Sequence, residues 1–293
     1  YRYGSTRRQP RRPLIVSVHW ILLPPTFLIG ASLLVVAAAW AVRVADEGKP
    51  AIVDRRAIGV VTREATARSL FTLLRWLPRR RAPQRAIAGV EHRRTPPVLL
   101  LPGLDFGPSS LFGLTTFLRR RGWPWVWAAA RGGRDEALAE RAQQLAGEIH
   151  AYRSETGADR IDIVAFGTGG LLAGWYLRHH PDAPVRRLVT IATPWGGTRI
   201  AVFQRGRAAT EVLPGSHLLD GLQPSTVPTT CIWSPDDPIV VPTTSAIPSS
   251  PAQSVRIEGA GHVEMLLSAR VYRAVQAALS QPSATQPGIG GEE

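Results

Sequence analysis

Two residue types that cooperate in proton transfer stand late in the chain, each after a predicted strand. Asp237 follows the apolar residues 229–233, and His262 lies in a glycine-containing turn after residues 254–258. A carboxylate in such a place can fix the tautomer of an imidazole, which then takes the proton of a nucleophilic side chain. Each residue alone also fits a structural role, Asp237 as a helix cap and His262 as a turn residue. Their joint position, each at the carboxyl end of a strand, favours an acid and a base of one site.

The position at which such a site would carry its nucleophile is filled by glycine. Residues 161–170 read as a buried strand, a tight turn and a helix, which is the form of the nucleophile elbow with its G-x-S-x-G signature. Residues 165–169 are Ala-Phe-Gly-Thr-Gly, so small residues are kept on both flanks while Gly167 takes the place of the serine. Glycine has no atom that can form an acyl-enzyme. The turn satisfies neither G-x-G-x-x-G nor a P-loop, which argues against a nucleotide site.

An earlier strand can supply the electrostatic part of the same chemistry. Residues 98–107 (Val-Leu-Leu-Leu-Pro-Gly-Leu-Asp-Phe-Gly) read as an apolar strand that ends in a glycine-containing turn before a helix. Such a turn can present a backbone N–H to a developing oxyanion. The signal is weak by itself, because many strand-to-helix turns use glycine. The order of nucleophile position, acid and histidine is the chain order of α/β-hydrolases.

Residues 97–279 resemble the α/β-hydrolase superfamily, and within it the small bacterial triacylglycerol lipases and esterases. The specific segments are residues 192–198 (Ala-Thr-Pro-Trp-Gly-Gly-Thr), 211–219 (Glu-Val-Leu-Pro-Gly-Ser-His-Leu-Leu) and 259–267 (Gly-Ala-Gly-His-Val-Glu-Met-Leu-Leu). The resemblance covers roughly the last two-thirds of the chain. It implies the α/β-hydrolase fold, with the site at the carboxyl ends of the strands.

The resemblance also assigns roles by position. Asp237 matches the acid of the catalytic triad, and the Pro-Ile-Val that follows it favours Asp237 over its neighbour Asp236. His262 matches the base. Leu104 and Thr168 match the two residues whose backbone amides form the oxyanion hole.

Three positions depart from the pattern of that family. Gly167 replaces the serine, Phe166 replaces the usual histidine before it, and Pro102 replaces the histidine of the usual His-Gly turn. Removing the serine of such a triad lowers turnover by roughly 10⁶-fold. The elbow residue normally sits in backbone strained by about 1–3 kcal/mol, and glycine relieves that strain. We therefore expect the fold to survive and ester hydrolysis to be lost.

Three functional hypotheses follow from the missing serine. The favoured one is a membrane-anchored pseudoenzyme that binds a lipid or acyl ligand or serves in a membrane protein complex. The second is an active carboxylic-ester hydrolase that uses another group. The groups open to it are Thr168, Ser109, Ser110 and water activated by His262. The third is an ordinary lipase whose serine has been substituted, which the further changes at Phe166 and Pro102 argue against.

The elements that must position these residues alternate along the chain. Strands are predicted at residues 98–101, 125–129, 161–166, 188–192, 229–233 and 254–258, and helices at 109–121, 134–155, 169–180 and 263–279. Buried strands separated by helices indicate a doubly wound α/β domain with a mostly parallel sheet of about six strands. The chain between Pro194 and Pro228 is too short for a large cap, so we expect an open or lightly covered site.

The N-terminal part reads as a membrane anchor. A basic segment, residues 1–13, precedes the anchor at residues 14–45, in which residues 26–42 are apolar on all sides. About 20 such residues span a bilayer, and the prolines at 24–25 are tolerated at a helix start. The arginines before it place the N-terminus in the cytoplasm and the hydrolase domain on the periplasmic or extracytoplasmic side. A buried core helix and a secretory signal cleaved near residues 39–41 are the alternatives.

The remaining segments complete the predicted organisation. Residues 46–96 hold an amphipathic helix, at residues 52–77, and a basic linker; this helix suits either a membrane interface or packing on the domain. The α/β-hydrolase domain is assigned to residues 97–280. The tail at residues 281–293 is rich in Pro, Gly and Ser and is predicted to be disordered.

Composition limits the partners. The net charge is +13, almost all from arginine, in a composition typical of a GC-rich bacterial genome. No aromatic residues alternate with the internal arginines as in a base-stacking surface, so we expect the bilayer as the partner and no nucleic acid. Cys231 is the sole cysteine, which excludes an internal disulfide and a cysteine metal cluster. We expect no cofactor and no metal.

Overall fold

The computed structural model describes residues 25–48, 55–74 and 95–282, except 105, 131, 134, 221, 223–226 and 249–251. The predicted basic segment, the first part of the anchor, most of the linker and most of the tail lie outside the described residues.

One parallel sheet forms the centre of the described chain. Its six strands follow the order β2-β1-β3-β4-β5-β6, with all neighbouring pairs parallel. The strands are β1 (Val98–Leu101), β2 (Val126–Ala128), β3 (Ile161–Phe166), β4 (Val185–Ile191), β5 (Thr229–Trp233) and β6 (Gln253–Arg256). The prediction of a doubly wound, parallel six-stranded sheet is confirmed.

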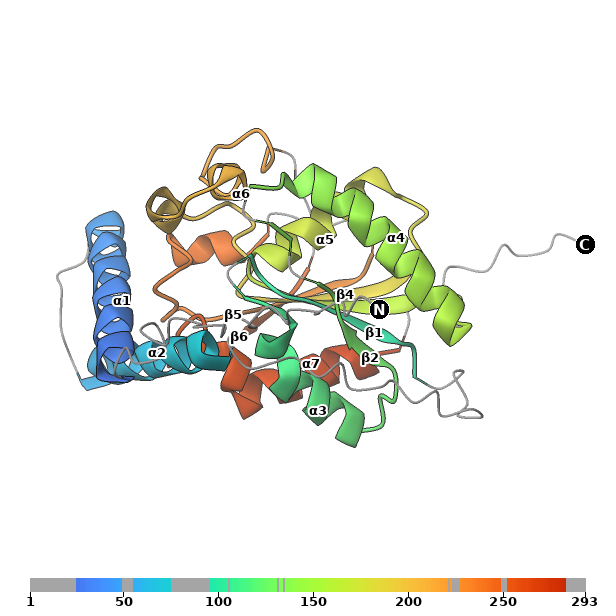
Figure 1. Ribbon diagram of the computed structural model, residues 1–293, viewed down its shortest axis with the longest axis horizontal. Helices are drawn as coiled ribbons and strands as arrows, with labels where there is room; N and C mark the ends of the chain where they lie inside the picture. The colour runs from blue at the N-terminus through green and yellow to red at the C-terminus, as the bar shows by residue number, and fades with distance from the viewer. Residues whose placement is uncertain are drawn as a thin grey trace, which may run out of the picture.

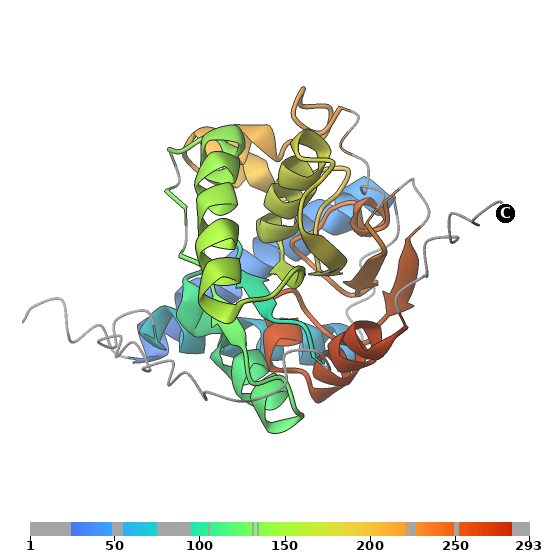
Figure 2. The same cartoon turned by 90° about the vertical axis from the view of Figure 1, so that its right-hand side faces the viewer.

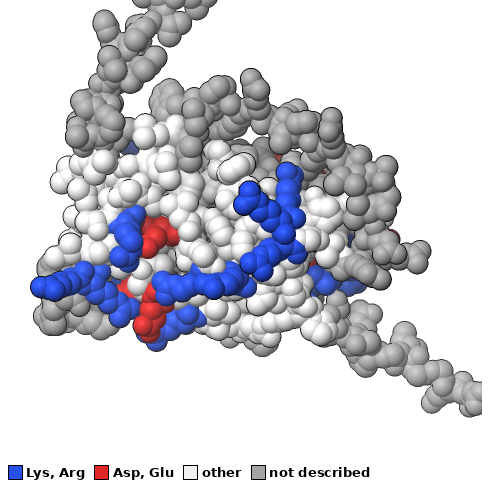
Figure 3. Space-filling model, turned by 90° about the horizontal axis from the view of Figure 1, so that it is seen from below, with Lys and Arg blue, Asp and Glu red and all other residues white. Residues whose placement is uncertain are grey.

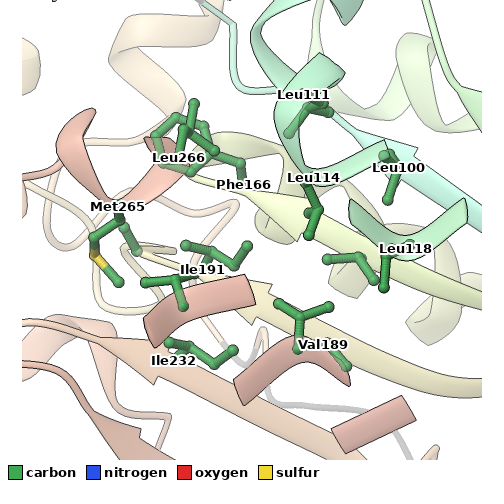
Figure 4. Packing of buried hydrophobic residues seen from close by; sticks show 14 of the residues in the cluster. Leu100, Leu111, Leu114, Leu118, Phe166, Val189, Ile191, Ile232, Met265 and Leu266 are labelled. Carbon is green, nitrogen blue, oxygen red and sulfur yellow. The ribbon is translucent and has the colours of Figure 1, made fainter. Parts of the chain in front are cut away.

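Helices cover both faces of this sheet (Figures 1 and 2). On one face lie α4 (Leu138–Thr156) and α5 (Thr168–His179), and on the other α3 (Phe112–Arg120) and α7 (Ala269–Ser280). The side chains of the inner strands β1, β3, β4 and β5 are largely buried on both faces, which is why their segments read as apolar runs. The edge strand β6 is mostly exposed. Figure 4 shows leucine, valine and isoleucine side chains filling the layer between the sheet and α3 and α7.

The apolar N-terminal helix α1 extends from Pro25 to Glu47. Its segment Ile29–Asp46 has a mean hydropathy of 1.6 and is long enough to cross a membrane, as an anchor or a signal sequence would. The same helix contacts the domain: Val36 and Ala39 are buried, while Leu34 on its outer side is 74% exposed. α1 therefore has one face against the protein and one apolar face turned outward.

The second helix, α2 (Arg55–Leu74), packs on the domain. The large apolar residues that recur at helical spacing in α2 mostly lie outside its buried face, since Ile58 and Leu73 remain about half exposed. The buried positions are instead small or polar, and Phe71 joins the core under α3 and α7. Small side chains let a helix approach its support closely, which explains why hydrophobic periodicity did not identify this face. Its buried residues are Ala57, Val60, Glu64, Ala65, Ala67, Ser69 and Phe71.

No large cap lies between β4 and β5 in the described chain. That segment contains only the short 3₁₀ helix η3 (Arg199–Phe203) and the short helix α6 (Arg207–Glu211). α1 packs beside η3, and Asp46 near the end of α1 pairs with Arg199 at 2.6 Å. The two N-terminal helices thus flank the end of the domain at which the site residues lie (Figure 1).

Candidate active site

Gly167 occupies the turn between β3 and α5 with the backbone angles φ 54° and ψ −127°. Few side chains tolerate this region, whereas glycine adopts it freely. Hydrogen bonds hold the turn: the Gly167 N–H donates to the Ile191 carbonyl at 2.8 Å, and the Thr193 hydroxyl donates to the Gly167 carbonyl at 2.9 Å. A Cβ atom built on Gly167 would lie 3.5 Å from Nε2 of His262, in ordinary contact. A side chain at this position would point at the imidazole.

A second glycine makes the turn possible. A Cβ atom on Gly169 would lie 2.7 Å from the Leu101 carbonyl oxygen and 2.8 Å from that of Pro102. Real Cβ atoms do not come so close to backbone oxygens, so α5 can start beside β1 only with glycine here. This close approach is the physical reason for the small flanking residue that the sequence pattern required.

Asp237 and His262 are brought together. Nδ1 of His262 lies 2.7 Å from Oδ2 of Asp237, and both side chains are buried. The other carboxylate oxygen of Asp237 accepts the N–H groups of Ile239 at 2.7 Å and Val240 at 3.0 Å. A proton on Nδ1 in this hydrogen bond leaves Nε2 facing Gly167. The pair can therefore hold or take a proton at Nε2.

The neighbouring Asp236 has a different set of contacts. Its Oδ2 accepts the N–H of Gly259 at 2.6 Å and pairs with Arg56 of α2 at 2.8 Å. It ties the start of α2 to the loop before His262, and it is Asp237 that contacts the imidazole.

Glu64 of α2 is a buried carboxylate that sequence patterns missed. Its Oε2 accepts the N–H of Val263 at 2.8 Å and of Glu264 at 3.0 Å, directly after His262. A Cβ atom on Gly261 would lie only 2.6 Å from the same oxygen, so the loop fits the helix closely. In the sequence, Glu64 is marked only by its place on the same helix face as Val60 and several alanines. The fold shows that this face is buried.

Charges around His262 shift its proton equilibrium. Burial by itself lowers the pKa of His262, but the charge of Asp237, its hydrogen bond and the charge of Glu64 outweigh burial and raise the pKa. Arg68 of α2 acts in the opposite direction. Burial raises the pKa of Glu64, and the imidazole and the two backbone amides offset this only in part. The imidazole of His262 is therefore more readily protonated in this site than a histidine side chain in water.

The amides assigned to the oxyanion hole lie at the same place, but one of them is engaged. The Leu104 N–H donates to Oγ1 of Thr168 at 2.8 Å. The Thr168 N–H lies in the first turn of α5, where amides have no acceptor within the helix. An anionic ligand would meet the Thr168 amide directly and would have to displace the hydroxyl to reach that of Leu104.

The alternative hydroxyl nucleophiles are turned elsewhere. The Thr168 hydroxyl faces Leu104, and the Ser110 hydroxyl donates to the Gly107 carbonyl at 2.8 Å. Neither Ser109 nor Ser110 lines the cavity at Gly167 among the residues that the structure describes. Phe166, at the position before Gly167, packs its ring on the imidazole with 4.9 Å between centroids.

A cavity of about 360 Å³ opens beside Gly167 and His262. Its described lining residues are Val35, Arg68, Gly103, Leu104, Phe106, Phe166, Gly167, Thr168, Pro194, Thr198, Ile200, Phe203, Gln204, Arg205, Val212, Ile239, Val240 and His262. The walls are mostly apolar, as in sites for small organic ligands. Within the described residues, no group of three or more His, Cys, Asp or Glu side chains is placed to hold a metal ion.

Solved structures with a similar fold include lipases. The mature Bacillus licheniformis lipase BlEst2 matches with a TM-score of 0.57 and 15% identity, over 65% of this chain and 95% of that chain. Aspergillus fumigatus lipase B matches with a TM-score of 0.60 and 14% identity, over 88% of this chain and 85% of that chain. A Listeria innocua protein matches with a TM-score of 0.51 and 15% identity, over 66% of this chain and 96% of that chain.

No protein-family model matches the sequence. The six-stranded parallel sheet and these structures show that the chain has the α/β-hydrolase fold, in a lipase- and esterase-like form.

Proposed function

We propose that this protein is a membrane-associated pseudoenzyme of the α/β-hydrolase fold that binds an acyl lipid at Gly167 without hydrolysing it. The observation that carries the proposal is the geometry of Gly167. Its backbone has the strained turn conformation of a nucleophile elbow, and its Cβ position lies 3.5 Å from Nε2 of His262. The hydrogen-bonded pair of Asp237 and His262 supports this proposal, because it faces a residue that has no side chain.

The apolar cavity supports a lipid as the ligand. Its walls combine α1, the β3–α5 turn and η3, so an acyl chain would lie between the hydrolase domain and the apolar helix. A serine at the position of Gly167 would take the acyl group of an ester lipid and release the alcohol of that ester; glycine has no atom that can accept the acyl group, so the ester bond stays intact. A protein partner in a membrane complex fits the same proposal if it covers the outer face of α1.

The membrane assignment rests on α1 and on charge. α1 has the length and composition of a single membrane span, with the N-terminus in the cytoplasm and the hydrolase domain on the periplasmic or extracytoplasmic side. The face seen from below carries a band of arginine side chains with few acidic ones (Figure 3). Such a band suits contact with anionic head groups.

A second candidate function is ester hydrolysis by water. The observation that favours it is the orientation of His262, whose Nε2 faces Gly167 while Asp237 holds Nδ1, as a general base requires. Water beside Gly167 would be activated in place of a serine. Such a reaction lacks the covalent step and would be slow.

One comparison separates these functions. Ester turnover is measured with short- and long-chain p-nitrophenyl esters for the wild-type chain, Gly167→Ser and His262→Ala. The proposal expects no turnover by the wild type, no labelling by a fluorophosphonate probe, and activity after Gly167→Ser. Wild-type turnover that His262→Ala abolishes would instead establish the water mechanism. Wild-type labelling by the probe would reveal a nucleophile at another residue.

A further inference from the structure

The cavity beside Gly167 has a distinctive balance of charge. Three basic side chains line it, those of Arg68, Arg205 and His262, and no carboxylate does so among the described residues. The remaining lining is apolar or carries uncharged polar groups. A binding site with this lining suits a ligand that has one anionic end and one apolar end.

Arg68 lines the cavity, and its charge interacts with that of His262. It belongs to α2 and is half-buried, and its charge lowers the pKa of His262, although the nearby acids raise that pKa by more. Within the described chain its guanidinium forms no ion pair. Two basic groups that line one cavity repel each other when both are charged, and an anion bound between them would relieve this repulsion.

The acids that hold the imidazole lie behind it. Asp237 contacts Nδ1, on the side away from Gly167, and Glu64 binds the backbone that follows His262. Neither carboxylate lines the cavity. They favour the protonated imidazole, and they leave its Nε2–H free to donate toward the space at Gly167.

We infer that the ligand is a single-chain amphiphile ending in a carboxylate, such as a long-chain fatty acid. This inference rests on the proposed function and names its ligand. The carboxylate would lie in the space that a side chain at Gly167 would fill, between Nε2 of His262 and the Arg68 guanidinium, with the Thr168 N–H nearby. A carboxylate matches the planar donor fork of arginine. No bond is made or broken, because glycine offers no acceptor for the acyl group.

The other end of the cavity fits the chain of such a ligand. Val35 of α1 and Phe203 of η3 line the cavity, yet they are 46% and 67% exposed. Two exposed apolar side chains therefore line the cavity, one of them on the helix that can span a membrane. A fatty acid would enter from the bilayer with its chain along α1 and its carboxylate toward Arg68.

The experiment measures the head-group preference of the full chain in a neutral maltoside detergent. The fluorescent fatty acid cis-parinarate reports occupancy, and three competitors share one oleoyl chain: oleate, oleoyl lysophosphatidate and monooleoylglycerol. The variant Arg68→Gln removes the cavity charge, and Arg68→Lys keeps it. Arg55→Gln is the matched control, because it removes the same charge from the same helix at an exposed position outside the lining.

We expect oleate to compete at least roughly tenfold better than monooleoylglycerol, as one charge-assisted hydrogen bond allows. Arg68→Gln should abolish this preference, while Arg68→Lys and Arg55→Gln should retain it. Equal competition by monooleoylglycerol, or an unchanged preference in Arg68→Gln, would overturn the inference that the ligand is anionic. The proposal that the cavity binds an acyl chain would still hold. Stronger competition by oleoyl lysophosphatidate than by oleate would overturn the inference that the head group is a carboxylate. Failure of cis-parinarate to bind would overturn both the inference and acyl binding, whereas wild-type ester turnover would overturn only the pseudoenzyme.

Discussion

Glu64 and Val263 are 199 positions apart in the chain and are joined by a 2.8 Å hydrogen bond from the Val263 N–H to the buried Glu64 carboxylate. The bond places the side chain of a helix that precedes the hydrolase domain directly behind His262. It makes α2 part of the site, since the same oxygen also accepts the N–H of Glu264.

The first prediction concerns this contact and stability. Glu64→Ala leaves two buried amides without an acceptor, and each such loss costs about 1–3 kcal/mol. Glu64→Gln keeps a carbonyl oxygen for both amides and should lose less. Thermal unfolding of the two variants measures the difference. Glu258→Gln, which changes an exposed acid, is the control; equal losses in Glu64→Ala and Glu64→Gln would mean that charge and not the two hydrogen bonds stabilises the loop.

The second prediction concerns the turn at β3. Gly167→Ser should create measurable ester hydrolysis, because a side chain there points at Nε2 of His262 from 3.5 Å. The same change should lower stability by about 1–3 kcal/mol, since serine must adopt a positive φ. Hydrolysis of p-nitrophenyl butyrate and thermal unfolding test the two effects on one protein. Gly167→Ala is the control, which should show the loss of stability without activity; an inactive and fully stable Gly167→Ser would contradict the elbow geometry.

The four inner strands β1, β3, β4 and β5 could be predicted well, because they are largely apolar and buried on both faces. The start of β4 was missed: the predicted strand began at Leu188, whereas β4 begins at Val185. Arg186 and Arg187 interrupt the apolar run, and their charges are accommodated only in three dimensions. Arg186 pairs with the buried Asp162 at 2.5 Å, and Arg187 donates to the Gln281 carbonyl at 2.8 Å.

The site residues also divide into those that local sequence patterns mark and those that only the fold brings to the site. The turn at Gly167 and the residues Asp237 and His262 lie in local patterns that strand ends and glycines mark. Glu64 and Arg68 belong to no such pattern, because their roles depend on how α2 docks near residues about 200 positions later in the chain. Helical periodicity did not predict which face of α2 is buried. In addition, no local signal marks a carboxylate whose partners are distant backbone amides.

The third prediction concerns the engaged amide of Leu104. The Leu104 N–H donates to the Thr168 hydroxyl at 2.8 Å. In the Gly167→Ser background, the oxyanion must displace this hydroxyl to accept the same N–H. Thr168→Val removes the hydroxyl and keeps the shape of the side chain. A single oxyanion donor is worth roughly 10²–10³ in kcat, so freeing it should raise kcat by a part of that range with little change in KM.

The kinetic constants of Gly167→Ser and of Gly167→Ser/Thr168→Val test this prediction. Thr115→Val, on α3, serves as a control for the loss of a threonine hydroxyl that bonds only the Leu111 carbonyl just before its helix. A lower kcat in the double variant would show that the Thr168 hydroxyl itself stabilises the oxyanion.

The fourth prediction uses the proton on His262, which has opposite effects on the two activities. Hydrolysis by Gly167→Ser needs the neutral imidazole as a base, so its rate should rise as pH passes the His262 pKa. Binding of oleate by the wild type uses the protonated imidazole, so affinity should fall over the same interval. Because Asp237 and Glu64 raise this pKa from 6.5, both transitions should lie above pH 6.5.

Glu64→Gln removes one of the two acidic charges and should move both transitions to lower pH. Profiles of kcat/KM and of oleate competition, with an NMR titration of the imidazole assigned through His262→Gln, measure the shift. The NMR titration distinguishes this effect from loosening of the loop, which would broaden or weaken binding without moving the midpoint. Transitions that stay in place after Glu64→Gln would show that Glu64 supports the loop only through its hydrogen bonds and that Asp237 alone sets the proton equilibrium of His262.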